Sequence, residues 1–176
     1  MEIRKALPED MPEILKIYDR ARAFMRETGN PNQWGNHNPP VSVLEKDVGA
    51  GQLYLLEDGA VICGVFAFII GEDPTYLTID GAWHSNREYG TIHRIAASGN
   101  RKGIFSACIQ FCEKKIGHLR IDTHEDNRIM QHVIVKHGFK PCGIIFLAKH
   151  QPAGNINAAQ FQEPFLFLLS VENLLT

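Results

Sequence analysis

The sequence lacks any long apolar stretch. A membrane-spanning helix needs about 20 consecutive apolar residues, whereas the longest candidate in the first half of the chain, residues 61–70, is shorter and contains Gly64. The first residues, Met-Glu-Ile-Arg-Lys-Ala, have no apolar segment of the kind found in secretory leaders. We therefore expect a cytoplasmic protein that does not insert into a membrane.

An excess of basic residues is also missing. The chain has 18 lysines and arginines against 20 acidic residues, and its net charge is −2. A surface that binds nucleic acids or anionic membranes usually needs a clear positive excess, so neither partner is expected. With 176 residues, 44% of them hydrophobic, the chain suffices for one well-buried domain and is short for two.

Cysteine pairs at the spacing of zinc sites are absent. Cys108 and Cys112 lie four residues apart on one face of an expected helix, but no second pair accompanies them. Cys63 and Cys142 lie in other apolar segments. We therefore expect buried, reduced thiols and no bound metal.

The two strict nucleotide-binding fingerprints do not occur either. Instead, residues 91–117 have the pattern of a strand, a short loop with Gly99 and Gly103, and a helix that opens near Arg101 or Lys102. Unpaired N–H groups and the positive end of the helix dipole at such a helix start suit phosphate oxygens. The loop is a candidate diphosphate site, and the alternative is an ordinary turn with a solvated basic pair.

The rest of the chain alternates between strand and helix patterns. Strands are expected at 2–5, 52–57, 61–70, 88–97, 118–123, 139–147 and 158–162, and helices at 8–28, at 41–50 and ahead of His137-Gly138. Asp58-Gly59 predicts a hairpin turn, and residues 77–87 are expected to be irregular. This order predicts α/β architecture with one mixed sheet and helices on both faces.

The end of the chain is strongly apolar. Residues 1–162 are expected to form the domain, and residues 163–176 a tail that contains Phe-Leu-Phe-Leu-Leu at 165–169. Because such a segment is too apolar to remain in water, it should pack on the domain or on a partner subunit. In the second case the protein would be a homodimer.

Two motifs, Asn100-Arg101-Lys102-Gly103-Ile104-Phe105 and the stretch from Asn127 to His137-Gly138-Phe139, resemble the acyl-CoA-binding core of the GNAT superfamily of N-acetyltransferases. That family's signature is Gln or Arg, two residues, Gly, one residue, and Gly or Ala, and Asn100-Arg101-Lys102-Gly103-Ile104-Phe105 is similar to it. A second motif, an Asn-led helix that closes on Gly-Phe, resembles Asn127 to His137-Gly138-Phe139. The element order agrees along residues 1–162.

The resemblance implies a twisted, mostly antiparallel sheet in which two central strands, here 88–97 and 118–123, splay apart. The pantetheine arm of acetyl-CoA would lie in the gap, and the diphosphate would lie at the helix start. The implied cofactor-binding residues are Ile95, Ala96, Ala97, Asn100, Arg101, Lys102, Gly103, Ile104, Phe105, Ser106 and Asn127.

Three positions depart from the family pattern. Asn100 replaces the usual Gln or Arg, and Phe105 stands where a small residue normally lets the backbone approach the cofactor. The Phe105 ring either points into the core or alters the cradle. The family's tyrosine, thought to protonate the leaving thiolate, matches Ile134. Because the coenzyme A thiol resembles a free cysteine, it can leave as a thiolate without an acid.

Acetyl transfer to an amine also needs a base, and histidine is the side chain that titrates near neutral pH. The candidate catalytic residues are His93, on the first splayed strand, and His124 and Glu125, at the end of the second. His93 could equally be hydrogen-bonded inside the core. Residues 124–127 could be a capping cluster with Asp126 or Asn127 as the N-cap of the next helix, and Glu125 could be a solvated surface residue.

The acceptor side is expected to include Trp34, Trp83 and Tyr89, although Trp34 could instead fold back as a lid on the core. The favoured interpretation is an N-acetyltransferase that uses acetyl-CoA and acts on a primary amine of a small molecule or peptide. Two alternatives stay open. One is a non-catalytic acyl-CoA-binding or regulatory domain, and the other is an unrelated α/β interaction domain without a cofactor.

Overall fold

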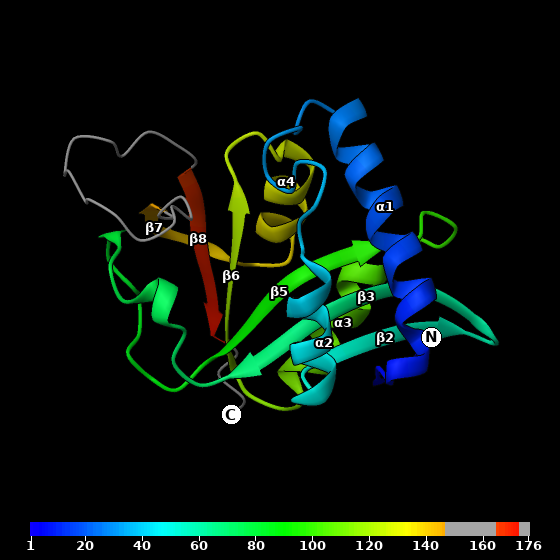
Figure 1. The fold of residues 1–176 in the computed structure, drawn as a ribbon. Coiled ribbons are helices and arrows are strands. Elements are labelled where there is room, and N and C mark those ends of the chain that lie inside the picture. The colour runs from blue at the N-terminus through cyan, green and yellow to red at the C-terminus, as the bar shows by residue number, and fades with distance from the viewer. Residues whose placement is uncertain (147–164, 173–176) are drawn as a thin grey trace, which may run out of the picture.

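The computed structural model describes residues 1–146 and 165–172, which form one eight-stranded sheet with helices on both faces (Figure 1). The strand order is β1-β2-β3-β5-β6-β8-β7-β4. The strands are β1 (Glu2–Lys5), β2 (Leu53–Asp58), β3 (Val61–Ile70), β4 (Asp80–Gly81), β5 (Gly90–Ala97), β6 (His118–His124), β7 (Lys140–Phe146) and β8 (Phe165–Glu172). The helices are α1 (Met11–Glu27), α2 (Val41–Gly49), α3 (Ile104–Glu113) and α4 (Arg128–Lys136), with single turns at Pro8–Asp10 and Pro74–Tyr76.

The two central strands, β5 and β6, separate along their length. They are the parallel pair of an otherwise antiparallel sheet. Their pairing joins residues 90–92 to residues 119–121 and then stops, although β5 continues to Ala97 and β6 to His124. Figure 1 shows the two strands diverging beyond this point. The mixed, mostly antiparallel sheet with a central splay is therefore confirmed.

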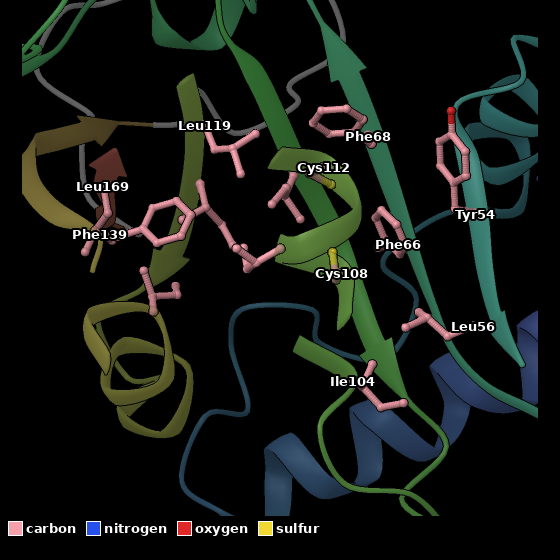
Figure 2. Packing of buried hydrophobic residues seen from close by; sticks show 14 of the residues in the cluster. Tyr54, Leu56, Phe66, Phe68, Ile104, Cys108, Cys112, Leu119, Phe139 and Leu169 are labelled. Atoms are coloured by element: carbon pink, nitrogen blue, oxygen red, sulfur yellow. The ribbon is translucent and has the colours of Figure 1, made fainter. Parts of the chain in front are cut away.

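Alternation along the strands divides the core into two layers. Leu53, Leu55 and Val65 pack with α1 and α2 on one face of the sheet. Tyr54 and Phe66 belong to the other layer, together with apolar residues of α3 and α4 (Figure 2). All four cysteines are buried and unbridged, as expected.

Helix α3 begins later than the sequence pattern predicts. We expected its start near Arg101 or Lys102, but the first helical residue is Ile104. Gly103 precedes it as the N-cap, with a φ of 83° in the left-handed region. Because a helix cannot continue back through a left-handed residue, Gly103 sets the start of α3.

The apolar end of the chain contributes an interior strand. Residues 165–172 form β8, which pairs with β6 on one side and with β7 on the other. The strand expected at 158–162 lies outside the described residues. Within residues 1–146 and 165–172, no helix combines the length and apolarity needed to cross a membrane.

Candidate active site

A β-bulge lies in β5 where this strand leaves β6. Val65 pairs with Ala96 and Ala67 with His93, so Arg94 and Ile95 together stand opposite a single residue of β3. Arg94 has a φ of 53°, in the left-handed region that residues other than glycine seldom adopt. The sequence pattern did not predict this bulge.

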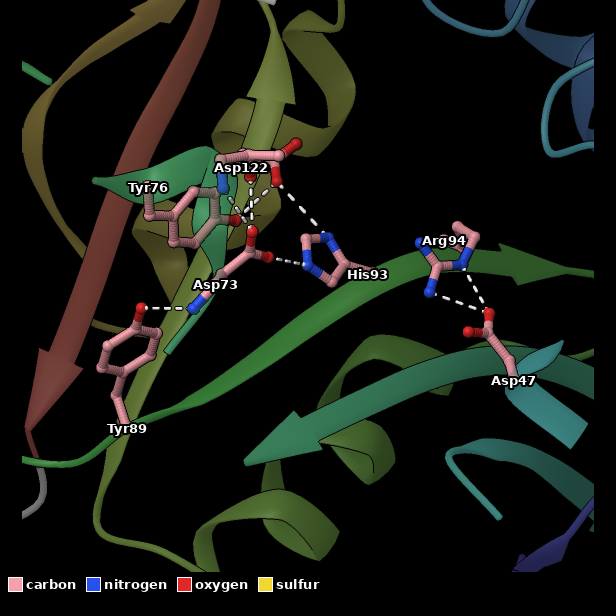
Figure 3. Close-up of polar contacts among 8 residues, drawn as sticks. Asp47, Asp73, Tyr76, Tyr89, His93, Arg94 and Asp122 are labelled. Atoms are coloured by element: carbon pink, nitrogen blue, oxygen red, sulfur yellow. Dashed lines mark hydrogen bonds and ion pairs between the residues drawn. The ribbon is translucent and has the colours of Figure 1, made fainter. Parts of the chain in front are cut away.

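His93, the residue before the bulge, lies between two carboxylates (Figure 3). Its Nε2 is 2.6 Å from Oδ2 of Asp73, and its Nδ1 is 3.5 Å from Oδ2 of Asp122. The same Asp122 oxygen accepts a hydrogen bond of 2.5 Å from the hydroxyl of Tyr76. The side chains of His93, Asp73 and Asp122 are 16%, 13% and 17% exposed. We call these four residues the His93 cluster.

Asp73 is held as a carboxylate. Burial alone would raise its pKa, but hydrogen bonds from His93 and Thr75 outweigh burial and lower the pKa to about 2. Thr75 contributes both its backbone N–H and its hydroxyl, at 2.8 and 2.6 Å. Burial, reinforced by the nearby charge of Asp122, raises the pKa of Tyr76 well above its usual range, so Tyr76 remains a donor.

These protonation states determine which ring nitrogen of a neutral His93 carries the proton. Asp73 can only accept, so Nε2 of His93 carries the proton and donates to it. Nδ1 is then the free lone pair of the ring, and it faces the side of Asp122. Nδ1 is therefore the ring atom at which His93 can accept a hydrogen bond or a proton.

The lowered pKa of Asp73 predicts an acid-dependent loss of stability. The unfolded chain binds a proton at Asp73 near pH 3.8, whereas the folded protein resists protonation down to about pH 2. The stabilising contribution of Asp73 to the free energy of unfolding is therefore fully present well above pH 3.8. It is expected to be lost as the pH falls from about 3.8 to about 2. Urea unfolding measured across it should show a smaller fall in the free energy of unfolding for Asp73→Asn than for the unmodified protein. Equal falls would contradict the expectation.

Trp83 and Tyr89, two of the residues predicted for the acceptor side, lie next to the His93 cluster. They enclose the guanidinium of Arg120, which is 3.7 Å from the centroid of each ring. The Trp83 indole N–H donates to the carbonyl of Tyr76 at 3.3 Å, and the Tyr89 hydroxyl accepts from the backbone N–H of Asp73 at 2.9 Å. This packing fixes the segment between β3 and β5, which carries Asp73 and Tyr76, against β6.

The other two predicted catalytic residues lie apart from this cluster. His124 is 1% exposed, and its Nδ1 accepts a hydrogen bond of 3.1 Å from the backbone N–H of Asp126. Its Nε2 is buried without a hydrogen-bond partner in the described part of the chain. Glu125 is partly exposed, and its carbonyl accepts from Gln131. Among the described residues, neither side chain forms a hydrogen bond or ion pair with His93.

Asn127, one of the two expected capping residues, is the N-cap of α4. Its Oδ1 accepts from the backbone N–H of Met130 at 3.0 Å, and its Nδ2 donates to Oε1 of Gln33 at 2.8 Å. The second bond ties the loop between α1 and α2 to α4. Trp34 in that loop packs edge-on against Tyr18, with the ring centroids 5.5 Å apart. This position matches the alternative in which Trp34 folds back on the core.

The start of α3 is the position predicted for the diphosphate. The first backbone N–H groups of α3, from Ile104 to Ser106, have no partner within a helix that starts there. A Cβ at Gly103 would find its nearest neighbour 4.0 Å away, so the space in front of this residue is open. A negatively charged group could therefore approach these amides closely.

Most side chains of residues 100–106 contact other protein groups and do not enter the open space in front of Gly103. The Phe105 ring packs on the core and edge-on against His137, at 5.0 Å between centroids, which matches the first of its two alternatives. Ser106 bonds Nε2 of His137 at 2.7 Å. Asn100 accepts a hydrogen bond from Ser98, and Arg101 pairs with Asp58 at 3.2 Å. Lys102 is exposed.

Ile95, Ala96 and Ala97 line the edge of β5 that β6 has left. Their backbone groups on that side have no strand partner among the described residues, so they can bind water or a ligand. Ile134 is fully buried in the core, so no proton donor stands at its position. Among the described residues, no group of three potential metal ligands occurs.

No family model matches this chain, and no curated protein matches it. Solved structures do. An acetyltransferase of the GNAT family from Streptococcus agalactiae is 27% identical, with a TM-score of 0.79 over 98% of this chain and 95% of that one. A GNAT-family acetyltransferase from Listeria monocytogenes is 22% identical, with a TM-score of 0.65 over 98% and 94%. A Salmonella typhimurium protein, solved with its cofactor acetyl-CoA, is 14% identical, with a TM-score of 0.57 over 97% and 92%.

Proposed function

Because the chain belongs to the GNAT superfamily of acetyltransferases, we propose that it transfers the acetyl group of acetyl-CoA to a primary amine of a small molecule or peptide. The amine would attack directly, with both substrates bound. One observation carries this proposal: the end of β5–β6 pairing, the bulge and the His93 cluster coincide at a single point of the sheet.

The residues present fit acetyl-CoA. The unpaired edge of β5 from His93 to Ala97 offers backbone groups to the amides of a pantetheine arm, as a neighbouring strand would. The amides of Ile104 to Ser106 offer donors to the diphosphate, and the missing side chain at Gly103 leaves room for it. Acetyl-CoA, when bound, supplies the activated thioester. The acetyl-CoA held by the Salmonella neighbour supports this assignment.

His93 is the proposed base. Its Nδ1 would take the proton of the attacking amine, directly or through water, while Asp73 holds the opposite ring nitrogen in place. Asp122 beside Nδ1 would stabilise the resulting imidazolium and favour a cationic acceptor near the ring. Because Ile134 is buried, the thiolate would leave without help from this position.

The remaining predicted residues keep secondary roles in the proposal. A backbone N–H of the bulge near Ile95 or Ala96 would polarise the acyl carbonyl. Trp83 and Tyr89 would shape the acceptor side, since they adjoin Tyr76 and Asp73. His124 and Glu125 would line the end of β6. The association of two copies stays a prediction.

The test is release of free thiol from acetyl-CoA, measured with a panel of primary amines that includes polyamines, amino acids and short peptides. At least one amine is expected to accelerate release well above the rate of hydrolysis. Coenzyme A should also raise the melting temperature, because it binds only the folded protein. Thermal stabilisation without thiol release from any amine would favour the non-catalytic acyl-CoA-binding alternative. Absence of both effects would overturn the proposal.

A further inference from the structure

The left-handed residue of the bulge is held in place by two helices that lie outside the site. Arg94 is not a glycine, and a side chain in this backbone conformation persists where its surroundings impose it. Two contacts hold Arg94 in this conformation. One is a hydrogen bond to its backbone carbonyl, and the other is an ion pair with its guanidinium.

The carbonyl contact comes from α1. Tyr18 is fully buried, and its hydroxyl donates a hydrogen bond of 2.8 Å to the carbonyl oxygen of Arg94. Burial raises the pKa of Tyr18, so its hydroxyl stays protonated and remains a donor. The edge-on Trp34 ring and the apolar layer around α1 fix the Tyr18 ring. The bond therefore ties the bulge to a rigid element.

The guanidinium contact comes from α2. Nε and Nη2 of Arg94 lie 2.9 and 2.8 Å from Oδ2 of Asp47 (Figure 3). The Asp47 side chain is only 7% exposed. Since a buried carboxylate without a partner is costly, this pair is strongly favoured once the helices pack. It pulls the Arg94 side chain toward α2 and away from the splay.

We propose that Tyr18, Arg94 and Asp47 act as a brace that positions the bulge for acetyl transfer. This inference rests on the proposed function, because the bulge follows His93 directly and includes the amide groups assigned to the acyl carbonyl. None of the three side chains is placed against a substrate. They act through the backbone of β5, so they are positioning residues.

The tests use Tyr18→Phe and Asp47→Asn, with Tyr54→Phe and Asp10→Asn as matched controls. Tyr54 is buried in the other layer of the core, and Asp10 pairs with Arg4. Among the described residues, neither side chain forms a hydrogen bond or ion pair with Arg94. Each brace variant is expected to lower kcat roughly ten- to hundred-fold with the best amine of the panel, because a small misplacement of reacting groups is costly. The KM for acetyl-CoA should change less than kcat does, because the diphosphate cradle at the start of α3 is untouched and only the pantetheine edge of β5 is loosened.

Arg94→Gly separates backbone strain from the ion pair. Glycine adopts the left-handed conformation freely but cannot reach Asp47. The variant is therefore expected to lose kcat to the same degree as Asp47→Asn. Full activity of Arg94→Gly, or unchanged kcat in both Tyr18→Phe and Asp47→Asn, would overturn the brace.

Amide hydrogen exchange gives a readout that does not depend on the reaction. In Tyr18→Phe, the amides of residues 94–97 are expected to exchange about ten-fold faster, because each lost hydrogen bond lowers the cost of local opening. The same amides should be unaffected in Tyr54→Phe. Unchanged exchange in Tyr18→Phe would refute the brace whether or not the protein is active. If the wild type were inactive but the amides of residues 94–97 exchanged faster in Tyr18→Phe, the brace would stand and only the proposed function would be refuted.

Discussion

Replacement of His93 by glutamine is expected to lower kcat by about 10²- to 10⁴-fold, the range that positioned general bases contribute. Glutamine is close to histidine in size and can still donate to Asp73, but its amide cannot take up a proton. Binding of coenzyme A, measured by thermal shift, should be preserved because His93 lies outside the cradle at the start of α3. The loss should therefore appear in kcat.

His84→Gln is the matched control for this experiment. His84 is an exposed histidine that contacts the carbonyl of Pro141 at 3.0 Å and does not belong to the His93 cluster. This control should retain wild-type activity within about two-fold, the small effect usual for surface substitutions. If His93→Gln were equally active, a different group or bulk water would have to accept the proton, and the role of the His93 cluster would be refuted.

Replacement of Gly103 by valine is expected to abolish thermal stabilisation by coenzyme A. The φ of 83° at this position is unfavourable for a β-branched residue, and the new side chain would stand in the open space before the first amides of α3. At saturating coenzyme A the unmodified protein should gain several degrees in melting temperature. The variant should gain almost none.

The control for backbone strain is Gly29→Val. Gly29 follows the end of α1 with a φ of 85°, and a Cβ added there would have no atom within 4 Å. Valine therefore suffers similar strain at this position without approaching the cradle. Both variants should melt at lower temperatures than the unmodified protein, but only Gly103→Val should lose the response to coenzyme A. A normal response in Gly103→Val would place the diphosphate elsewhere.

The fold could be predicted because its determinants are local. The alternation of apolar residues along β2 and β3, the Asp58-Gly59 turn and the helical spacing after Gly103 all predict elements close to those in the structure. The exact start of α3 could not be predicted, because Arg101 and Lys102 are acceptable helix residues. Their exclusion follows from the left-handed conformation of Gly103.

The site was only partly accessible from the sequence, because its contacts join distant segments. The bulge at Arg94 contains no glycine or asparagine, the residues that would indicate a left-handed conformation in the sequence. The hydrogen-bond partners of Arg94 are Tyr18, 76 residues away, and Asp47, 47 residues away. Asp73 contacts His93 and Tyr76 contacts Asp122 from a loop that has the sequence of an ordinary polar turn. Likewise, Asp126 and Asn127 are both good capping residues.

One signal for the missed residues was present in β6. Polar residues alternate along this strand at 118, 120, 122 and 124, and they face away from the layer that contains Leu119 and Ile121. Such a period of two marks a polar strand face. Taken together with His93 on the neighbouring strand, it would have indicated Asp122 as a candidate for the site.

The position of β8 has a consequence for biosynthesis. A ribosome completes β6 and β7 before it has made residues 165–172, yet in the sheet these two strands are neighbours of β8 and not of each other. Until that last segment emerges, both strands expose unpaired edges that invite intermolecular pairing. Premature termination before residue 165 should therefore yield chains that aggregate, while all the residues assigned to catalysis are already present.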